Sequence, residues 1–528
     1  MSSETLLCRM KTSFPWGLFL ILVLGAFFRF LCYRDTPVIN PDGVLYIHQA
    51  RAIYYGQLEE LTTCSMSYLS IYPLGIAGAY LIFHQWIMAA KFVSILFGTL
   101  TLIPSYLLLA AFFERRTALL GALAFSLIPV MVLKSGDVLR GPVFWFFLAM
   151  GLYFFVAQMK GDRCRLRLSL SSLCLLLAAW ARVEALLFVM LTGAFLLFSG
   201  QDRKLEKCLF YVAPLCLVLL IALSGCTLWG TGLDGFLRWE EVVNKLTGPF
   251  TGYETLRGQL LPLIHRHEMG LPEYFLEHAR HLVWLIALGT LCSSVMKAYF
   301  YPFFVVFLLG LPGLFSRMSR DSRLSYLGVL SGTALLLLYL HILQTWIMHT
   351  RFLILFMIPA VFVLGFGLER IIQWTTSHLR ITPSVVMLLL GGVLVAASSA
   401  KIVKPHEADK AVFKRIGEHI ASREGHEKII PVACSSHTIR WVAFYANLGY
   451  EGAPCPQRNY QLTEMAHNGY GAFVGKLKSA GVKYFLWEEK HWPEASFDFR
   501  AKVKAHHFIE RGRWHHPDTG GLILFELL

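Results

Sequence analysis

The sequence predicts an α-helical, multi-pass membrane protein that ends in a small α/β domain. Of its 528 residues, 56% are hydrophobic and only 16% are charged, and the mean hydropathy is +0.54. The charged residues gather between long apolar runs, which is typical of a chain that crosses a bilayer repeatedly. From residue 403 onward the composition turns polar, with short apolar runs that read as buried strands.

About eleven segments approach the roughly 20 apolar residues that a membrane-spanning helix needs. They are residues 14–32, 87–113, 117–134, 141–158, 168–181, 183–199, 208–228, 300–316, 324–345, 351–368 and 383–401. Residues 67–86, which include Pro73, are expected to form a helix along the membrane interface. A second crossing there would move Arg115 and Arg116 to the outer side, against the positive-inside rule.

Lysine and arginine predict the orientation. Basic residues are in excess at 115–116, 160–167, 202–207, 317–323 and 369–380, which is every second turn between spans. The positive-inside rule puts these turns and the N-terminus in the cytoplasm, so we expect a plasma (inner) membrane protein. This distribution also accounts for the net charge of +14. No basic stripe interleaved with aromatic residues indicates a nucleic-acid partner.

The N-terminal apolar run is expected to be a signal anchor, because no small-residue cleavage site follows Leu31. The map then predicts a membrane domain over residues 1–402 and an extracytoplasmic α/β domain over residues 403–528. The membrane domain has outer loops at 33–86, 134–141 and 229–299, and an amphipathic helix is expected at 281–299. In the tail we expect helices at 407–421, 437–448 and 463–479, and strands at 429–434, 482–487 and 521–527.

The 11 cysteines contain no CxxC pair, and most lie in apolar segments. Cys434 and Cys455 fall in the polar tail, and Cys64 falls in the first outer loop. In an oxidising compartment a Cys434–Cys455 disulfide and two unpaired thiols are the alternatives. The pairs His506-His507 and His515-His516 are not expected to bind metal.

The first candidate site is the turn at residues 40–43, Asn-Pro-Asp-Gly, which follows the first span. A carboxylate at a membrane surface is costly unless it has a task, and Pro and Gly present Asp42 in a turn. Asp42 is therefore a candidate general base, with Tyr46 one helical turn later and Arg51 further along the same segment. The alternative is an Asx turn that caps the next helix.

Three further groups of charged residues lie at or near the outer ends of the predicted spans. Asp137, between Lys134 and Arg140, is either a second acid or part of a helix cap before Pro142. Arg182 and Glu184 lie in apolar sequence, where pairing for structural support is the favoured reading. His349 and Arg351 open a late span, where an arginine binds a phosphate or reaches toward lipid headgroups.

Taken in chain order, these motifs resemble a known family. They are Asp42 with Tyr46, Tyr72-Pro73-Leu74, Arg115-Arg116, Asp137, Arg182-Val183-Glu184 and Arg351-Phe352. With the outer α/β domain, the chain resembles the GT-C superfamily of polyprenyl-phosphate-sugar glycosyltransferases. The likeness is to bacterial relatives of the dolichyl-phosphate-mannose protein mannosyltransferases, with the aminoarabinose–lipid A transferase as a cousin.

The resemblance implies an inverting enzyme that takes a sugar from undecaprenyl or dolichyl phosphate to a protein, lipid or glycan acceptor. Asp42 would be the general base, with Asp137 as a second acid. The donor phosphate would contact Arg51, Lys134, Arg140, His349 and Arg351, while Tyr46, Arg182 and Glu184 would shape the cavity. The resemblance leaves open a divalent cation (Mg²⁺ or Mn²⁺) as cofactor, and Gly43, which stands where relatives often have Glu, weighs against it.

Two other functions stay open. A polysaccharide polymerase or ligase would use a large outer loop with Arg and His, and 229–299 contains His265, Arg266, His267 and His278. A lipid-linked-glycan transporter usually has inverted repeats and ionisable residues near mid-membrane. Here the charges lie at outer span ends and no repeat is detected.

Overall fold

The computed structural model describes residues 16–62, 64, 66–160, 165–198, 203–229, 239–264, 272–434, 438–457, 462–493, 497–504 and 506–528. The chain divides into two compact units. The helical unit contains the chain up to Cys32 together with residues 94–136 and 140–403. The mixed unit contains residues 33–93, 137–139 and 404–528. The polar tail therefore shares a unit with the first outer loop.

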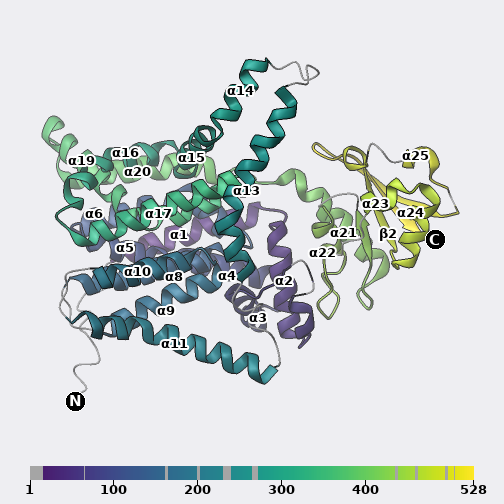
Figure 1. Cartoon of the computed structure of the whole chain (residues 1–528), viewed down its shortest axis with the longest axis horizontal. Helices are drawn as coiled ribbons and strands as arrows, with labels where there is room; N and C mark the ends of the chain where they lie inside the picture. The colour runs from purple at the N-terminus through teal and green to yellow at the C-terminus, as the bar shows by residue number, and fades with distance from the viewer. Residues whose placement is uncertain are drawn as a thin grey trace. The chain divides into compact units, whose positions relative to one another are not determined.

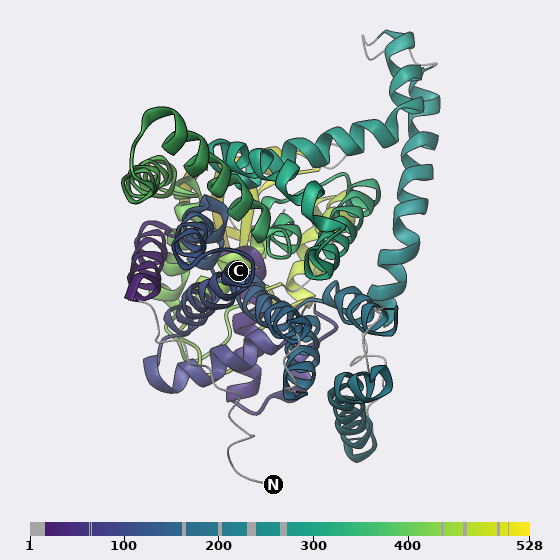
Figure 2. The ribbon, with the colours of Figure 1, turned by 90° about the vertical axis from the view of Figure 1, so that its left-hand side faces the viewer.

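Figure 1 shows the helices of the helical unit running side by side, with α5 against α8 and α16 against α17. Helix α13 packs against α17 over part of its length, while its far end and α14 extend away from the bundle in both views (Figures 1 and 2). The membrane-type helices and their neighbours are α1 (Trp16–Asp35), α4 (Trp86–Leu100), α5 (Leu102–Ala110), α6 (Arg115–Leu127), α7 (Pro129–Ser135), α8 (Gly141–Met159), α9 (Leu166–Ala181), α10 (Ala185–Phe198), α11 (Lys204–Trp229), α13 (Trp239–Ile264), α14 (Glu273–His281), α15 (Val283–Tyr299), α16 (Tyr301–Met318), α17 (Ser322–Thr345), η4 (Thr350–Leu353), α18 (Ile354–Met357), α19 (Val361–Leu379) and α20 (Pro383–Ile402).

Among the described residues, 6 helices are long and apolar enough to cross a membrane, or up to 9 if each bent helix pair is one span. The bends are 58° between α6 and α7, 74° between α14 and α15, and 75° between the η4–α18 segment and α19. Pro129 and Pro359 lie at two of these breaks, where proline removes a helical hydrogen bond. The multi-pass helical class is confirmed. The number of helices that could span a membrane is below the expected eleven. One reason is that α9 and α10 have only 16 and 14 residues.

The mixed unit contains the helices of the first loop and the whole sheet. Its elements are α2 (Pro41–Tyr54), η2 (Leu58–Leu61), α3 (Ile71–Phe83), η5 (Ala408–Lys410), α21 (Ala411–Glu424), β1 (Val432–Cys434), α22 (Ile439–Ala446), α23 (Leu462–His467), α24 (Tyr470–Ser479), β2 (Tyr484–Glu488), η6 (Glu489–His491), α25 (Phe499–Lys502), β3 (Phe508–His516) and β4 (Gly520–Leu527). The strand order is β1-β2-β4-β3, with β1 parallel to β2 and the other pairs antiparallel.

An aromatic core packs against one face of this sheet, and its buried rings include Phe473 of α24, Phe485 of β2, Phe499 of α25 and Phe525 of β4. The expected helix at 463–479 is two helices, α23 and α24. Gly469 separates them with a φ of +85°, a left-handed conformation that favours glycine. Strand β3 was not expected, because its sequence is polar and it gains its place by pairing with β4.

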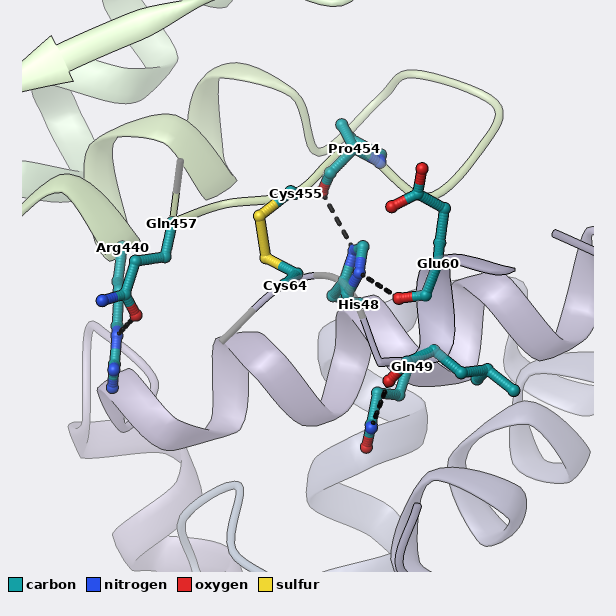
Figure 3. Close-up of a disulfide and its surroundings, with 9 residues drawn as sticks. His48, Gln49, Glu60, Cys64, Arg440, Pro454, Cys455 and Gln457 are labelled. Carbon is teal, nitrogen blue, oxygen red and sulfur yellow. Dashed lines mark hydrogen bonds between the residues drawn. A yellow bond between two sulfur atoms is a disulfide. The ribbon is translucent and has the colours of Figure 1, made fainter. Parts of the chain in front are cut away.

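Neither alternative for the two tail cysteines, a Cys434–Cys455 disulfide or two unpaired thiols, describes the structure. Cys455 is bonded to Cys64, with 5.5 Å between their Cα atoms, and joins the first outer loop to the tail within the mixed unit (Figure 3). Cys434 is a free thiol in β1, where burial raises its pKa well above the usual range. The two bonded cysteines are 391 residues apart, so no local pattern indicates their pairing.

Candidate functional site

The turn before α2 presents Asp42 without using it as a cap. The side-chain oxygen of Asn40 accepts the backbone N–H of Asp42 at 3.0 Å, and Pro41 occupies the first helical position. Asn40 therefore caps the helix, and the Asp42 side chain keeps 38% of its surface exposed. A carboxylate in a first helical turn is also stabilised by the helix dipole.

Asp42 forms an ion pair with a residue from the tail. Arg440 of α22 donates from Nη1 to Oδ1 of Asp42 at 3.3 Å, and its Nε donates to the side-chain oxygen of Gln457 (Figure 3). The side chain of Arg440 is 23% exposed. Sequence reasoning missed Arg440, since nothing local links it to a turn 398 residues away.

Asp137 holds the same turn from a different segment. Its Oδ1 accepts the backbone N–H of Asn40 at 3.0 Å and that of Val138 at 2.7 Å, and the residue is buried. Gly43 packs closely here, because a Cβ at this position would lie 2.6 Å from the carbonyl oxygen of Val138. Because residues 137–139 lie this close to the turn, only a glycine fits at the position after Asp42.

Tyr46 and Arg51 are buried parts of α2. The Tyr46 ring meets the Tyr72 ring edge to face, with 5.5 Å between centroids. The Arg51 guanidinium donates to the carbonyl oxygens of Gly452 at 2.6 Å, Asn447 at 3.3 Å and Leu448 at 3.5 Å, and also to that of Tyr450. Burial lowers the pKa of Arg51 to about 10. Its donors therefore join α2 to residues 447–452, and we leave it out of the proposed phosphate site.

A cavity of about 610 Å³ adjoins the Asp42 turn within the mixed unit. It is lined by Pro41, Lys410, Phe413, Thr438, Arg440, Trp441, His491, His516, Asp518 and Thr519. Its basic groups are paired with acids: His491 with Glu488 at 3.0 Å and His516 with Asp409 at 3.1 Å. The lining of the cavity therefore contains paired basic and acidic groups and has no large excess of positive or negative charge.

One group of side chains in the mixed unit could hold a divalent cation. The ligand atoms of Asp409, His516 and Asp518 all lie within 4.8 Å of one another. Two carboxylates and an imidazole suit such an ion, so His516 belongs to a possible site that sequence reasoning did not expect. At Asp42 the fit is poor, since an arginine already pairs with the carboxylate and Gly43 supplies no second one.

In the helical unit, Arg182 and Glu184 form the expected ion pair, with 2.8 Å between Nη2 and Oε1. Lys245 of α13 joins them, with its Nζ at 2.7 Å from the same Oε1. The Arg182 guanidinium also lies over the rings of Phe144 and Phe352, at 5.6 and 5.0 Å from their centroids. Structural pairing is thus present, and the same groups line a pocket.

This charged pocket has a volume of about 150 Å³. Its polar lining consists of Arg140, Arg182, Glu184, Lys245, His341 and Gln344. The structure therefore brings together three residues that the sequence singled out, and adds Lys245, His341 and Gln344. Among the described lining residues Arg140, Arg182 and Lys245 are cationic and Glu184 is the one carboxylate, while Lys245 also pairs with Glu241 at 3.7 Å. Positive charge remains in excess, which suits an anion such as a phosphate.

Lys134, His349 and Arg351 do not line the charged pocket in the described part of the helical unit. Lys134 lies in the last turn of α7. His349 precedes η4, with its ring 5.8 Å from that of Phe352, and the Arg351 guanidinium lies 5.2 Å from the same ring. Residues 265–267 lie outside the described residues, and His278 is on α14 with Nδ1 at 2.8 Å from the carbonyl oxygen of Tyr274.

The helical unit also contains an apolar groove of about 750 Å³. Leucine, phenylalanine and valine side chains of α15, α16, α17 and α19 dominate its lining. On α17, the groove is lined by residues from Gly328 to Tyr339, and the charged pocket by residues from Leu337 to Gln344. The groove and the charged pocket therefore share α17 but no lining residue, and they take side chains from different faces of this helix.

The sequence matches no protein-family model, and no curated protein matches it. Solved structures do match. The oligosaccharyltransferase AglB of Archaeoglobus fulgidus, in complex with an inhibitory peptide and a dolichol-phosphate, aligns with a TM-score of 0.58 and 12% identity. The alignment covers 96% of this chain and 74% of AglB. The structure of the same enzyme with Zn and sulfate aligns with a TM-score of 0.56 and 12% identity, over 95% of this chain and 72% of AglB.

ArnT of Cupriavidus metallidurans, bound to undecaprenyl phosphate, aligns with a TM-score of 0.58 and 11% identity. Here the alignment covers 97% of this chain and 98% of ArnT. This chain shares its fold with both neighbours over nearly its whole length, and the multi-pass helical class that the sequence predicted is confirmed. At this identity the likeness establishes the fold, and the activity must be argued from the sites.

Proposed function

We propose that this protein is an inverting glycosyltransferase that moves a sugar from a polyprenyl-phosphate carrier to an acceptor, with Asp42 as general base. The observation that carries the proposal is that the helical unit combines an apolar groove with a separate pocket that contains Arg140, Arg182 and Lys245, and that α17 lines both. A polyprenyl phosphate has the same two parts, a long apolar chain and an anionic head. The GT-C fold of the chain supports the same reading.

The donor would bind in the helical unit. Its prenyl chain would lie in the groove, where burial of apolar surface is favourable at about 25 cal/mol per Å². Its phosphate would accept hydrogen bonds from Arg140, Arg182 and Lys245, while Glu184 keeps the latter two oriented. Lys134, His349 and Arg351 remain proposed contacts of the donor, outside the lining of the charged pocket.

The acceptor would be activated in the mixed unit. The Asp42 carboxylate takes the proton of an acceptor hydroxyl as its oxygen attacks the anomeric carbon. The bond from that carbon to the phosphate oxygen breaks, the configuration inverts, and the lipid phosphate leaves as an anion. Asp137 holds the turn through two backbone N–H groups, so we assign it a positioning role rather than that of a second acid.

We further propose that the mixed unit faces the extracytoplasmic side of the inner membrane. The Cys64–Cys455 disulfide supports this orientation, because disulfides persist in oxidising compartments. The basic turns of the sequence support a cytoplasmic N-terminus. The cell-envelope acceptor, whether protein, lipid or glycan, would then meet the enzyme on that side.

A divalent cation is compatible with the mixed unit, and we propose Asp409, His516 and Asp518 as its ligands. Carboxylate donors suit Mg²⁺ and Mn²⁺, the two ions that the family resemblance suggests. No reaction step is assigned to this ion. Binding of Mn²⁺ to purified protein, measured by calorimetry, should disappear in Asp518→Asn.

The test of the function is transfer of a labelled sugar from a polyprenyl-phosphate sugar to membrane acceptors, comparing wild type with Asp42→Asn. We expect Asp42→Asn to lose at least about 100-fold in transfer, the usual contribution of a general base, while donor binding is retained.

The matched control is Asp35→Asn, which removes a carboxylate of the same unit. Asp35 pairs with Arg34 at 3.1 Å, and the variant should transfer normally. Equal transfer by wild type and Asp42→Asn would remove Asp42 from the mechanism. Absence of transfer in all three proteins would favour a transporter or a polymerase.

A further inference from the structure

Helix α22 of the tail contacts the Asp42 turn at three places. The indole N–H of Trp441 donates to the carbonyl oxygen of Ile39 at 2.8 Å, and the backbone N–H of Ile39 donates to the hydroxyl of Tyr445 at 3.3 Å. Arg440 provides the third contact, to the Asp42 carboxylate. Trp441 and Tyr445 are 7% and 3% exposed, so they anchor the helix, whereas Arg440 remains partly open to solvent.

Arg440 is itself held in place from the tail side. Its Nε donates to Gln457, which follows Cys455 by two residues (Figure 3). Cys455 is covalently bonded to Cys64 of the first loop. The Arg440 guanidinium thus connects Gln457, next to the disulfide-bonded Cys455, with the Asp42 carboxylate. Because the guanidinium is planar and rigid, it limits the positions that the Asp42 side chain can adopt.

A metal ion at Asp42 does not fit this arrangement. Arg440 already supplies a positive charge at 3.3 Å, and Asp42 belongs to no cluster of three or more potential metal ligands among the described residues. The next residue, Gly43, cannot be exchanged for a ligand without meeting the backbone of Val138. The carboxylate of Asp137 accepts two backbone N–H groups.

We propose that Arg440 is a positioning residue that serves as the fixed counter-charge of Asp42, so that transfer needs no divalent cation at that carboxylate. The inference rests on the proposed function, in which Asp42 accepts the proton of the acceptor. By holding one carboxylate oxygen, Arg440 restricts the rotamers of Asp42. It thereby keeps the carboxylate in the orientation that accepts the proton of the acceptor hydroxyl. Misplacement of a reacting group by about 1 Å is enough to slow a reaction by about 100-fold.

The experiment uses full-length purified protein, a polyprenyl-phosphate sugar as donor and variants at two arginines of the mixed unit. Arg440→Gln should lower kcat by about 10- to 100-fold while the KM for the donor changes less than about twofold, because the donor site lies in the helical unit. Arg440→Lys should recover part of kcat, since it restores the charge without the planar fork. Arg415→Gln, which removes an exposed arginine of α21, is the control and should retain wild-type kcat.

EDTA treatment gives a second, independent readout. It is applied to Asp518→Asn, because in the wild type EDTA would also empty the proposed cation site at Asp409, His516 and Asp518, and transfer by this variant should be the same with and without EDTA. Gln457→Ala keeps the charge of Arg440 but removes the acceptor of its Nε, so a smaller loss of kcat is expected even if Arg440→Gln does not fold. Normal kcat in both Arg440→Gln and Gln457→Ala would overturn the proposal, as would loss of transfer by Asp518→Asn in EDTA that Mn²⁺ restores. If Asp42→Asn transfers normally, the proposed function fails instead, and the two failures are thereby distinguished.

Discussion

Two neighbouring polar residues of the first loop have different tasks that the sequence does not separate. Asn40 accepts the backbone N–H of Asp42 and so performs the capping that was the alternative reading for the turn. The Asp42 carboxylate is thereby left for Arg440 and for chemistry. At the residue scale, the residue types in the turn predict that a site exists. The contacts of Asn40 and Asp42 decide which of the two caps the helix and which is available for chemistry.

His48 of α2 illustrates a conflict between burial and hydrogen bonding. Its Nδ1 lies 3.2 Å from the carbonyl oxygen of Pro454 and its Nε2 lies 3.1 Å from that of Glu60 (Figure 3). A neutral imidazole donates to only one of these oxygens, so the two carbonyls favour the protonated ring. Burial is the stronger influence, and it lowers the pKa of His48 below 6.5.

The sign of the resulting pH dependence follows from this direction. The unfolded chain, with a histidine pKa of about 6.5, takes up a proton before folded His48 does, so stability is lost as the pH falls below about 6.5. Above that value the contribution of neutral His48 to stability is complete.

We expect the Tm of the wild type to fall more steeply between about pH 7.5 and pH 5.5 than that of His48→Gln. His467→Gln, at an exposed position of α23, should keep the wild-type slope. Identical slopes for His48→Gln and wild type would contradict the assignment.

At the scale of elements, α17 carries two functions on one helix. Its middle section lines the apolar groove and its C-terminal section lines the charged pocket. The sequence predicted a span at 324–345, and the observed helix is Ser322–Thr345. The apolar run determined the helix. It lines two pockets because other helices pack against it, including α13, α15, α16 and α18.

A leucine at Gly332 should block the proposed chain groove without disturbing the fold. Gly332 lines the groove, and a Cβ there meets no atom within 4 Å. Leucine also has a higher helix propensity than glycine by about 0.8 kcal/mol, so the substitution should not destabilise α17. We expect Gly332→Leu to raise the KM for a long-chain polyprenyl-phosphate sugar by about 10-fold or more, since its side chain takes the place of buried chain methylenes.

The matched control is Gly289→Leu on α15, which also has no atom within 4 Å of its Cβ position and does not line the groove. Its KM should equal that of the wild type. A donor with a much shorter prenyl chain should be affected less by Gly332→Leu. An equal rise in KM for the short and long donors would argue that the chain lies elsewhere.

At the scale of the whole molecule, the Cys64–Cys455 disulfide ties the two ends of the chain into one unit. It links residues 391 apart, and closing so long a loop limits the unfolded chain, so loss of the bond typically costs about 2–5 kcal/mol. The positive-inside rule and the disulfide are the two independent grounds for the proposal that the mixed unit is extracytoplasmic.

A thiol-labelling experiment on whole cells tests that orientation. After mild reduction, a membrane-impermeant maleimide added from outside the inner membrane should label Cys455, which is half-buried. Cys64 and Cys434 should stay unlabelled until the protein unfolds, because both are buried. A Cys64→Ser, Cys455→Ser double variant is the control, and reduction should add no labelling to that of its exposed cysteines, Cys216 and Cys292. Labelling of wild type only after the inner membrane is permeabilised would reverse the proposed topology.

The sequence by itself determined the helical membrane class, the helical segments and the outer turn at Asp42, because apolar runs, loop charges and Pro-Gly turns are local signals. It also located Arg182 and Glu184, which are two residues apart. Only the tertiary structure decided that Arg440 pairs with Asp42, that Lys245 joins Glu184, and that Cys455 bonds Cys64. These partners are 398, 61 and 391 residues apart. Since such contacts arise from packing of distant segments, no spacing in the sequence specifies them.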